Sequence, residues 1–258
     1  MKPRYVWLDF LKGLAIVAVL VDHLYNLYKN PLVQYHTSYS VAIFIFLAGI
    51  TSAMTLSRHN TFQFYKKRLV SIIIPYTIAT IVLCLLFKKP FFLSLINFNA
   101  AGPLYFIAFF MQLILIAPIL NKLNYLFLPL IYLLAFSLNR FHFTNLWGGG
   151  EFLFGGSFLF LFFLGMIFYK NIHLFKPKII YSILSLIILI CFEYFKLMPA
   201  TWHNPSYPLT MTYTLTIFFL FYNLNLNAQN PLIRFFSFLG RYSLYIFLYH
   251  PLIFLVYP

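Results

Sequence analysis

Residues 7–25 read WLDFLKGLAIVAVLVDHLY, an apolar run of the length that crosses a lipid bilayer. A transmembrane helix needs about 20 mostly apolar residues. Similar runs recur along the chain, because 62% of its 258 residues are hydrophobic and only 9% are charged. A soluble domain carries about 25% charged residues. The sequence therefore predicts an all-α protein, a polytopic transmembrane helical bundle of about nine to ten spans.

Nine apolar segments follow one another with short connections between them. No linker is long enough to divide the chain, so we expect residues 1–258 to form a single domain. Hydropathy and turn residues place the segments at 6–28, 38–56, 69–87, 103–120, 124–138, 157–169, 179–195, 209–225 and 240–257.

The formal net charge of +14 is unevenly distributed between the two sets of connections. Basic residues gather in the connections on the side of the N-terminus, and Lys66, Lys67 and Arg68 form the densest group. Cytoplasmic connections of membrane proteins collect Lys and Arg in this way. The bias predicts a multi-pass protein of the plasma membrane with a cytoplasmic N-terminus, membrane lipids as its surroundings and no nucleic-acid partner.

The first apolar segment carries four ionisable residues: Asp9, Lys12, Asp22 and His23. Such side chains are costly inside a membrane and usually face a cavity or a partner. At 3.6 residues per turn, Lys12 and His23 share one face of a helix and lie about 16 Å apart along it. Asp9 belongs to the same stripe and Asp22 points away from it. An Asp9–Lys12 pair at the inner interface, with His23 at the outer headgroups, is the simpler interpretation.

Two outer connections, 139–156 and 196–208, combine aromatic and polar side chains. An interfacial aromatic belt explains this composition. The functional alternative is the rim of an outward-facing cavity for a carbohydrate, because sugar rings stack on aromatic faces and hydrogen-bond to polar groups. In that interpretation Trp202 and His203 contact the acceptor, and Glu151 orients its hydroxyl.

Five motifs resemble, in their order, those of the acyltransferase-3 family of integral membrane acyltransferases. The first is a basic residue followed by ten residues and a histidine, here Lys12-GLAIVAVLVD-His23, although the family more often has Arg in place of Lys12. The second stretch carries Ala48-Gly49 where the family has Ser-Gly, and the third is similar to a basic cytoplasmic loop that enters a span with a proline. The motifs after the first are FIFLAGITSAM (44–54), FYKKRLVSIIIPY (64–76), GPLYFIAFFMQLILIAP (102–118) and FLGRYSLYIFLYHPLIF (238–254).

The resemblance implies transfer of an acyl group, usually acetyl, from cytoplasmic acyl-coenzyme A to a hydroxyl of an outward-facing carbohydrate, a lipid-linked glycan or another cell-envelope glycan. No metal is implied. His23 would be the catalytic residue, either as general base or as the nucleophile that takes the acyl group. The remaining implied roles are donor binding by Lys12, Lys66, Lys67, Arg68 and Tyr105, and structural support by Asp9 and His250.

A transporter or flippase for a glycolipid or small anion is the main alternative, because the same polar stripe could line a transport pathway. Asp9 is expected to pair with Lys12 or Arg68, and Glu193 with Lys196 three residues later.

Overall fold

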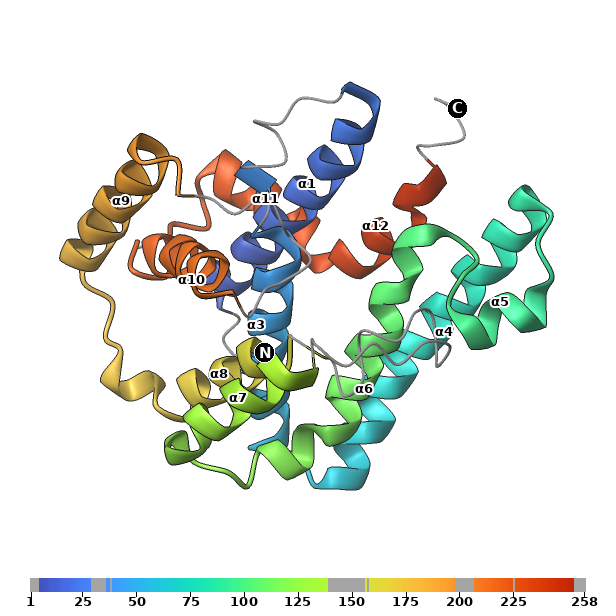
Figure 1. The fold of residues 1–258 in the computed structure, drawn as a ribbon, viewed down its shortest axis with the longest axis horizontal. Coiled ribbons are helices and arrows are strands. Elements are labelled where there is room, and N and C mark those ends of the chain that lie inside the picture. The colour runs from blue at the N-terminus through green and yellow to red at the C-terminus, as the bar shows by residue number, and fades with distance from the viewer. Residues whose placement is uncertain are drawn as a thin grey trace. The chain divides into compact units, whose positions relative to one another are not determined.

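The computed structural model describes residues 5–28, 36, 37, 39–138, 156, 158–197, 207–224 and 226–252. Every regular element in these ranges is helical, with eleven α-helices, short 3-10 turns and no strand (Figure 1). The all-α prediction is therefore confirmed for the part of the chain that the structure describes.

Most helices coincide with a predicted apolar segment. The agreement is closest for α1, which begins and ends at the predicted residues. The helices that overlap most of a predicted segment are α1 (Val6–Tyr28), α3 (Ser40–Leu56), α6 (Tyr105–Leu120), α7 (Leu128–Leu138), α8 (Leu159–Lys170), α9 (Ile179–Tyr194) and α10 (Pro208–Tyr222).

Helix α4 (Thr61–Phe87) starts earlier than the predicted segment 69–87. Asn60 caps it, because its side-chain oxygen accepts a hydrogen bond of 2.9 Å from the backbone N–H of Gln63. The helix ends at Lys88, which adopts a left-handed conformation with φ of 53°. The stretch FYKKRLV therefore forms helical turns, so the predicted start at residue 69 was wrong, while its cytoplasmic location stays a prediction.

A short helix that the sequence did not predict, α5 (Phe91–Asn97), packs on α4. The hydroxyl of Tyr76 donates to the backbone oxygen of Leu95 at 3.0 Å, and the Tyr76 ring stacks on Phe98 with 4.9 Å between centroids. Seven residues are too few to show a helical period in the sequence.

The last predicted segment, 240–257, contains α12 (Ser243–Tyr249) and is preceded by a helix that the sequence did not predict, while residues 253–257 lie outside the described residues. Helix α11 (Pro231–Arg241) begins at the cap of Asn230, whose side chain accepts from the backbone N–H of Leu232 at 2.9 Å. Helix α12 follows directly and leads into a 3-10 turn, η5 (His250–Leu252). Arg241 consequently lies within a helix and not in a connection.

The chain forms two compact units, each made of segments distant in sequence. The first unit contains Met1–Leu47 and Lys170–Phe247, and the second contains Ala48–Tyr169 and Leu248–Pro258. Both units are discontinuous along the chain. The single domain expected for residues 1–258 stays a prediction.

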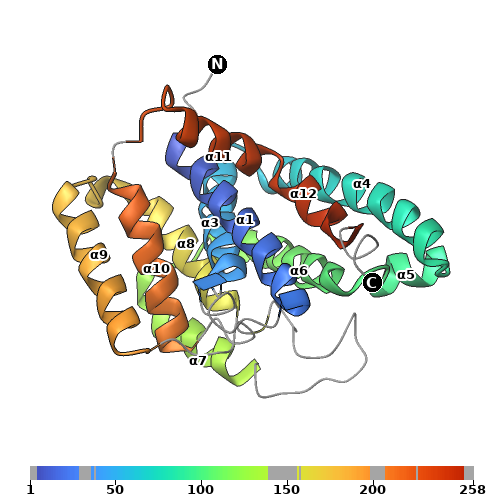
Figure 2. The same cartoon turned by 90° about the horizontal axis from the view of Figure 1, so that it is seen from above.

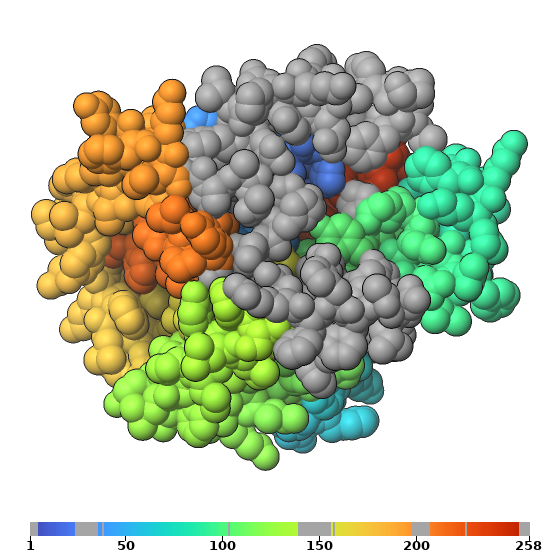
Figure 3. All heavy atoms as spheres, in the orientation of Figure 1, coloured from blue at the N-terminus to red at the C-terminus, as the bar shows by residue number. Residues whose placement is uncertain are grey.

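Helix α4 is the one described helix that is both long enough and apolar enough to cross a membrane by itself. Six further apolar helical segments have 10–17 residues, so the count of nine to ten spans stays a prediction. Helix α9 nevertheless buries Ser182, Ser185 and Phe192 and exposes isoleucine and leucine along its length. Its side chains stand at the surface beside those of α10 (Figure 3).

Candidate functional site

Helix α1 holds the ionisable stripe as the sequence predicts. It runs without interruption from Val6 to Tyr28, so Lys12 and His23 lie on one face about 16 Å apart along the axis. Both side chains are half-buried, and Asp9 on the same stripe is only 6% exposed. Lys12 and His23 are therefore each partly shielded from solvent.

Arg241 supplies an ion-pair partner for Asp9. The Nε of Arg241 lies 3.9 Å from Oδ2 of Asp9, and it reaches that carboxylate from α11. The expected pairing with Lys12 or Arg68 stays a prediction. Nothing in the sequence indicated that Arg241 contacts Asp9, because Asp9 and Arg241 are far apart in the chain and meet only through helix packing.

Helices α1 and α11 lie side by side in unusually close contact (Figure 2). A Cβ atom added to Gly13 would overlap the backbone carbonyl of Phe236, and one added to Gly240 would overlap the carbonyl of Asp9. Small residues allow two helix backbones to approach in this manner. This contact fixes the turn of α1 that carries Lys12 and brings Arg241 to Asp9.

Aromatic rings hold the N-terminal end of α1 on α10. The Trp7 ring meets Phe218 and Tyr222 edge-on, with 5.8 and 5.2 Å between centroids. At the other end of α1, Asp22 accepts a hydrogen bond of 2.8 Å from the hydroxyl of Thr37. Asp22 thus has a structural partner, in agreement with its place away from the stripe.

The acidic residue near the end of α9 does not follow its predicted pairing. Glu193 was expected to pair with Lys196, but its carboxylate lies 3.9 Å from Nε2 of His36. Lys196 adopts a left-handed backbone conformation with φ of 48° just after the helix, and its N–H donates to the backbone oxygen of Glu193.

Arg68 occupies a polar site inside the second unit, whereas Lys66 and Lys67 on the same helix are exposed. Its Nη2 donates to Oγ1 of Thr55 at 3.1 Å, and that hydroxyl donates in turn to the backbone oxygen of Thr51 at 2.7 Å. The Nε of Arg68 is buried and meets no acceptor among the described residues.

Few carboxylates are available to Arg68 within its own unit. Ala48–Tyr169 and Leu248–Pro258 contain a single acidic residue, Glu151, which lies outside the described residues. A buried guanidinium is stabilised by an anion or by several hydrogen bonds. The arrangement at Arg68 therefore suits an anionic ligand.

The other predicted site residues divide between the two units and the part that the structure leaves undescribed. Tyr105 opens α6 in the second unit, half-buried, with its ring 6.1 Å from that of Phe109. His250 is buried in η5, also in the second unit. Glu151, Trp202 and His203 lie outside the described residues.

One polar contact of the second unit escaped the sequence reasoning. The hydroxyl of Tyr65, three residues before Arg68, donates to the backbone oxygen of Leu115 at 2.6 Å. This hydrogen bond links α4 to α6. One tyrosine among 20 gives no signal by itself. Within the described residues, no group of three or more His, Cys, Asp or Glu side chains could hold a metal ion.

We expect the Asp9–Arg241 pair to respond unequally to loss of its two members. Arg241→Gln leaves a buried carboxylate without this cation and should cost on the order of 1 kcal/mol or more in the free energy of unfolding. Asp9→Asn leaves Arg241, whose side chain is 48% exposed and stays hydrated, so its cost should be smaller. Thermal unfolding of the two variants in detergent measures the difference, and a larger cost for Asp9→Asn would contradict this account.

The described part of the protein is all-helical, and its candidate functional residues lie on helices and not in connections. The family model described as an acyltransferase domain matches residues 5–257, almost the whole chain, which therefore belongs to the acyltransferase-3 family. The protein is thus an acyltransferase. No curated protein and no solved structure gives a significant match to the chain.

Proposed function

We propose that this acyltransferase moves an acyl group, usually acetyl, from cytoplasmic acyl-coenzyme A to a hydroxyl of an outward-facing carbohydrate or cell-envelope glycan. The observation that carries the proposal is the unbroken helix α1, which presents Lys12 and His23 on one face about 16 Å apart. Membership of the acyltransferase-3 family supports the reaction class, and families of this kind generally act on carbohydrates.

The exposed apolar helices support a multi-pass location in the plasma membrane. On α9, Ile180, Leu186 and Ile190 are each at least half exposed, and α4 exposes Leu85 to 76%. Soluble monomers rarely expose continuous apolar surfaces of this kind. In a bilayer the same faces contact lipid, and the basic residues near the N-terminal side favour a cytoplasmic N-terminus.

His23 provides the chemistry in this proposal. A neutral imidazole removes the proton of the acceptor hydroxyl as its oxygen attacks the thioester carbonyl carbon. The carbon–sulfur bond then breaks, coenzyme A leaves as a thiolate, and the proton returns to it from the imidazolium. In the two-step alternative, the imidazole nitrogen attacks first and holds the acyl group until the hydroxyl displaces it.

Basic side chains bind the phosphates of the donor. Arg68 supplies a planar guanidinium with an N–H that no described protein group accepts, and such a fork suits a phosphate. Lys12 acts as a point charge on the helix that bears His23. Lys66 and Lys67 add positive potential for an anionic donor.

The reaction is tested with purified protein, labelled acetyl-coenzyme A and a panel of cell-envelope glycans. Wild-type protein should release free coenzyme A and transfer label to at least one glycan. Lys12→Ala should raise the KM for acetyl-coenzyme A and change kcat less. If no acyl-coenzyme A is bound or consumed, the proposed reaction is wrong and a transport function becomes the better explanation.

We expect Arg68→Gln to raise the KM for acetyl-coenzyme A about tenfold to a hundredfold. A hydrogen bond to a charged group contributes about 1.5–3 kcal/mol, and each 1.4 kcal/mol is a factor of ten. Arg68→Lys keeps the charge without the fork and should lie between wild type and Arg68→Gln. Lys67→Gln is the matched control, because its side chain is exposed and its loss should change KM less than about fivefold. An unchanged KM for Arg68→Gln would remove Arg68 from the donor site.

A further inference from the structure

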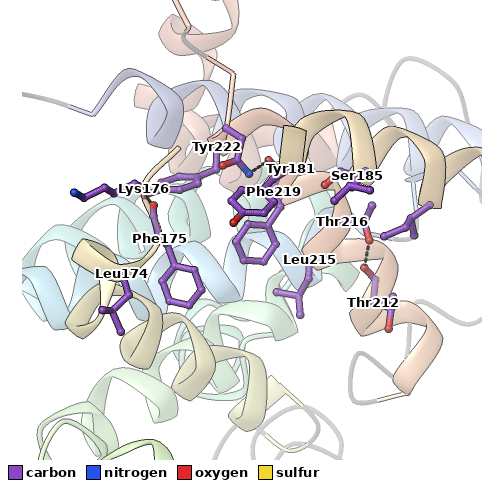
Figure 4. A pocket seen from close by; sticks show the side chains of 13 residues that line it. Leu174, Phe175, Lys176, Tyr181, Ser185, Thr212, Leu215, Thr216, Phe219 and Tyr222 are labelled. Carbon is purple, nitrogen blue, oxygen red and sulfur yellow. Dashed lines mark hydrogen bonds between the residues drawn. The ribbon is translucent and has the colours of Figure 1, made fainter. Parts of the chain in front are cut away.

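A groove of about 520 Å³ opens between α9 and α10 in the first unit. The turn η4 (Ile172–Leu174) and the residues that follow it close one end. Apolar side chains make up most of the walls, as the row of Phe175, Phe219 and Leu215 shows (Figure 4). Residues of both helices and of the preceding turn line this groove, and none of them belongs to the residues proposed for acyl transfer.

Three hydroxyl groups of the groove donate to backbone oxygens of the protein. The hydroxyl of Thr212 donates to the backbone oxygen of Pro208 at 2.8 Å, and that of Thr216 donates to the oxygen of Thr212 at 2.7 Å. The hydroxyl of Tyr222 donates to the oxygen of Phe175 at 2.7 Å. These donors do not point at a guest, so the walls suit a hydrocarbon chain better than a sugar.

Charge is confined to one end of the groove. Lys176 is exposed there, while Thr212 marks the opposite end (Figure 4). From Thr212 to Asn223, α10 rises about 16 Å, which is close to half of the hydrocarbon core of a bilayer, about 30 Å thick. The groove therefore matches the acyl chain of a single leaflet, with a cation placed where an anionic headgroup would lie.

We propose that this groove binds one acyl chain of an anionic phospholipid and that Lys176 binds the phosphate of its headgroup. The acyl chain of the lipid lies along Leu184 and Ile188 of α9 and along Leu215 and Phe219 of α10. Lys178, two residues after Lys176, has its ammonium group 5.9 Å from the centroid of the Tyr181 ring and adds a second positive charge near the same end. The proposal rests on membrane insertion and not on the acyl-transfer chemistry.

The test uses full-length protein reconstituted in an equimolar mixture of phosphatidylglycerol and phosphatidylcholine, extracted into detergent, with the retained lipids measured by mass spectrometry. Wild-type protein should retain phosphatidylglycerol in preference. Lys176→Gln should reduce that preference about fivefold, the ratio that corresponds to about 1 kcal/mol for one lysine near a membrane surface. Leu215→Trp fills the groove and should remove the retained phosphatidylglycerol.

Two variants serve as matched controls. Ile190→Trp places the same ring on an exposed part of α9 outside the groove, and Lys122→Gln removes one exposed charge from the second unit; both should retain lipid as wild type does. Size-exclusion and thermal unfolding profiles show whether Leu215→Trp is folded; if it is not, the Lys176→Gln preference alone decides. Equal retention of the two lipids by wild type, or an unchanged preference in Lys176→Gln, would overturn the proposal. Release of coenzyme A, measured on the same samples, reports separately on acyl transfer.

Discussion

Replacement of His23 with alanine is expected to lower the rate of coenzyme A release by a factor of about 10² to 10⁴, the usual contribution of a positioned acid–base group. The loss should fall on kcat, because the methyl group of alanine can neither remove the proton of the hydroxyl nor carry an acyl group. The KM for acetyl-coenzyme A should change little, since Lys12 and Arg68 are proposed to bind the phosphates. Steady-state rates with varied donor concentration measure both constants.

His173→Ala is the matched control for this variant. His173 lies in η4 and is exposed, and it does not belong to α1, so its loss should leave kcat unchanged. Thermal unfolding should show that His23→Ala is folded. His23 is half-buried, so its truncation removes fewer packing contacts than the loss of a fully buried side chain would. Full turnover by a folded His23→Ala protein would exclude His23 as the catalytic residue.

Substitution of Gly13 by alanine should be among the most destabilising single changes in the first unit. The added methyl group meets the backbone carbonyl of Phe236, which cannot move aside as a flexible side chain does. Overpacking of a tight contact costs about 1–3 kcal/mol and occasionally more. Gly240→Ala meets the carbonyl of Asp9 across the same helix pair and should have a similar effect. The midpoint of thermal unfolding in detergent measures both.

Gly102→Ala is the control for the glycine pair, because a Cβ atom at that position meets nothing within 4 Å. Its midpoint should stay within the experimental scatter of wild type. Since α1 also bears His23, surviving Gly13→Ala protein should lose acyl transfer in addition to stability. A Gly13→Ala midpoint equal to that of Gly102→Ala would mean that α1 and α11 are not as close as the structure places them.

Local patterns account for the features that were predicted correctly. The bounds of α1 follow from one long, mostly apolar segment, and the alignment of Lys12 with His23 follows from the period of a helix. The errors lie at element ends. Asn60 caps α4 ahead of the basic stretch, so the helix includes Lys66, Lys67 and Arg68. Asn230 likewise caps α11, which begins before the predicted segment. A cap depends on the conformation of one residue, which an apolar pattern does not encode.

The pairings of charged residues show most clearly what the sequence could not predict. Sequence spacing suggested that Glu193 meets Lys196, whereas the structure places its carboxylate beside His36. Arg241 reaches Asp9 from α11, a contact that no spacing rule suggests. The environment of Arg68 is equally invisible in the sequence, because Thr55 reaches it from another helix.

The sequence by itself determined the helical class, the places of most helices, the family and the stripe of Lys12 and His23, since each depends on neighbours within a few turns of one helix. Only the tertiary structure decided which polar groups meet: Arg241 at Asp9, Thr55 at Arg68 and the groove beside Lys176. These contacts join residues far apart in the chain, so they depend on how closely helix surfaces pack. That closeness is set by small residues such as Gly13 and Gly240, whose importance appears only when the facing backbone is known.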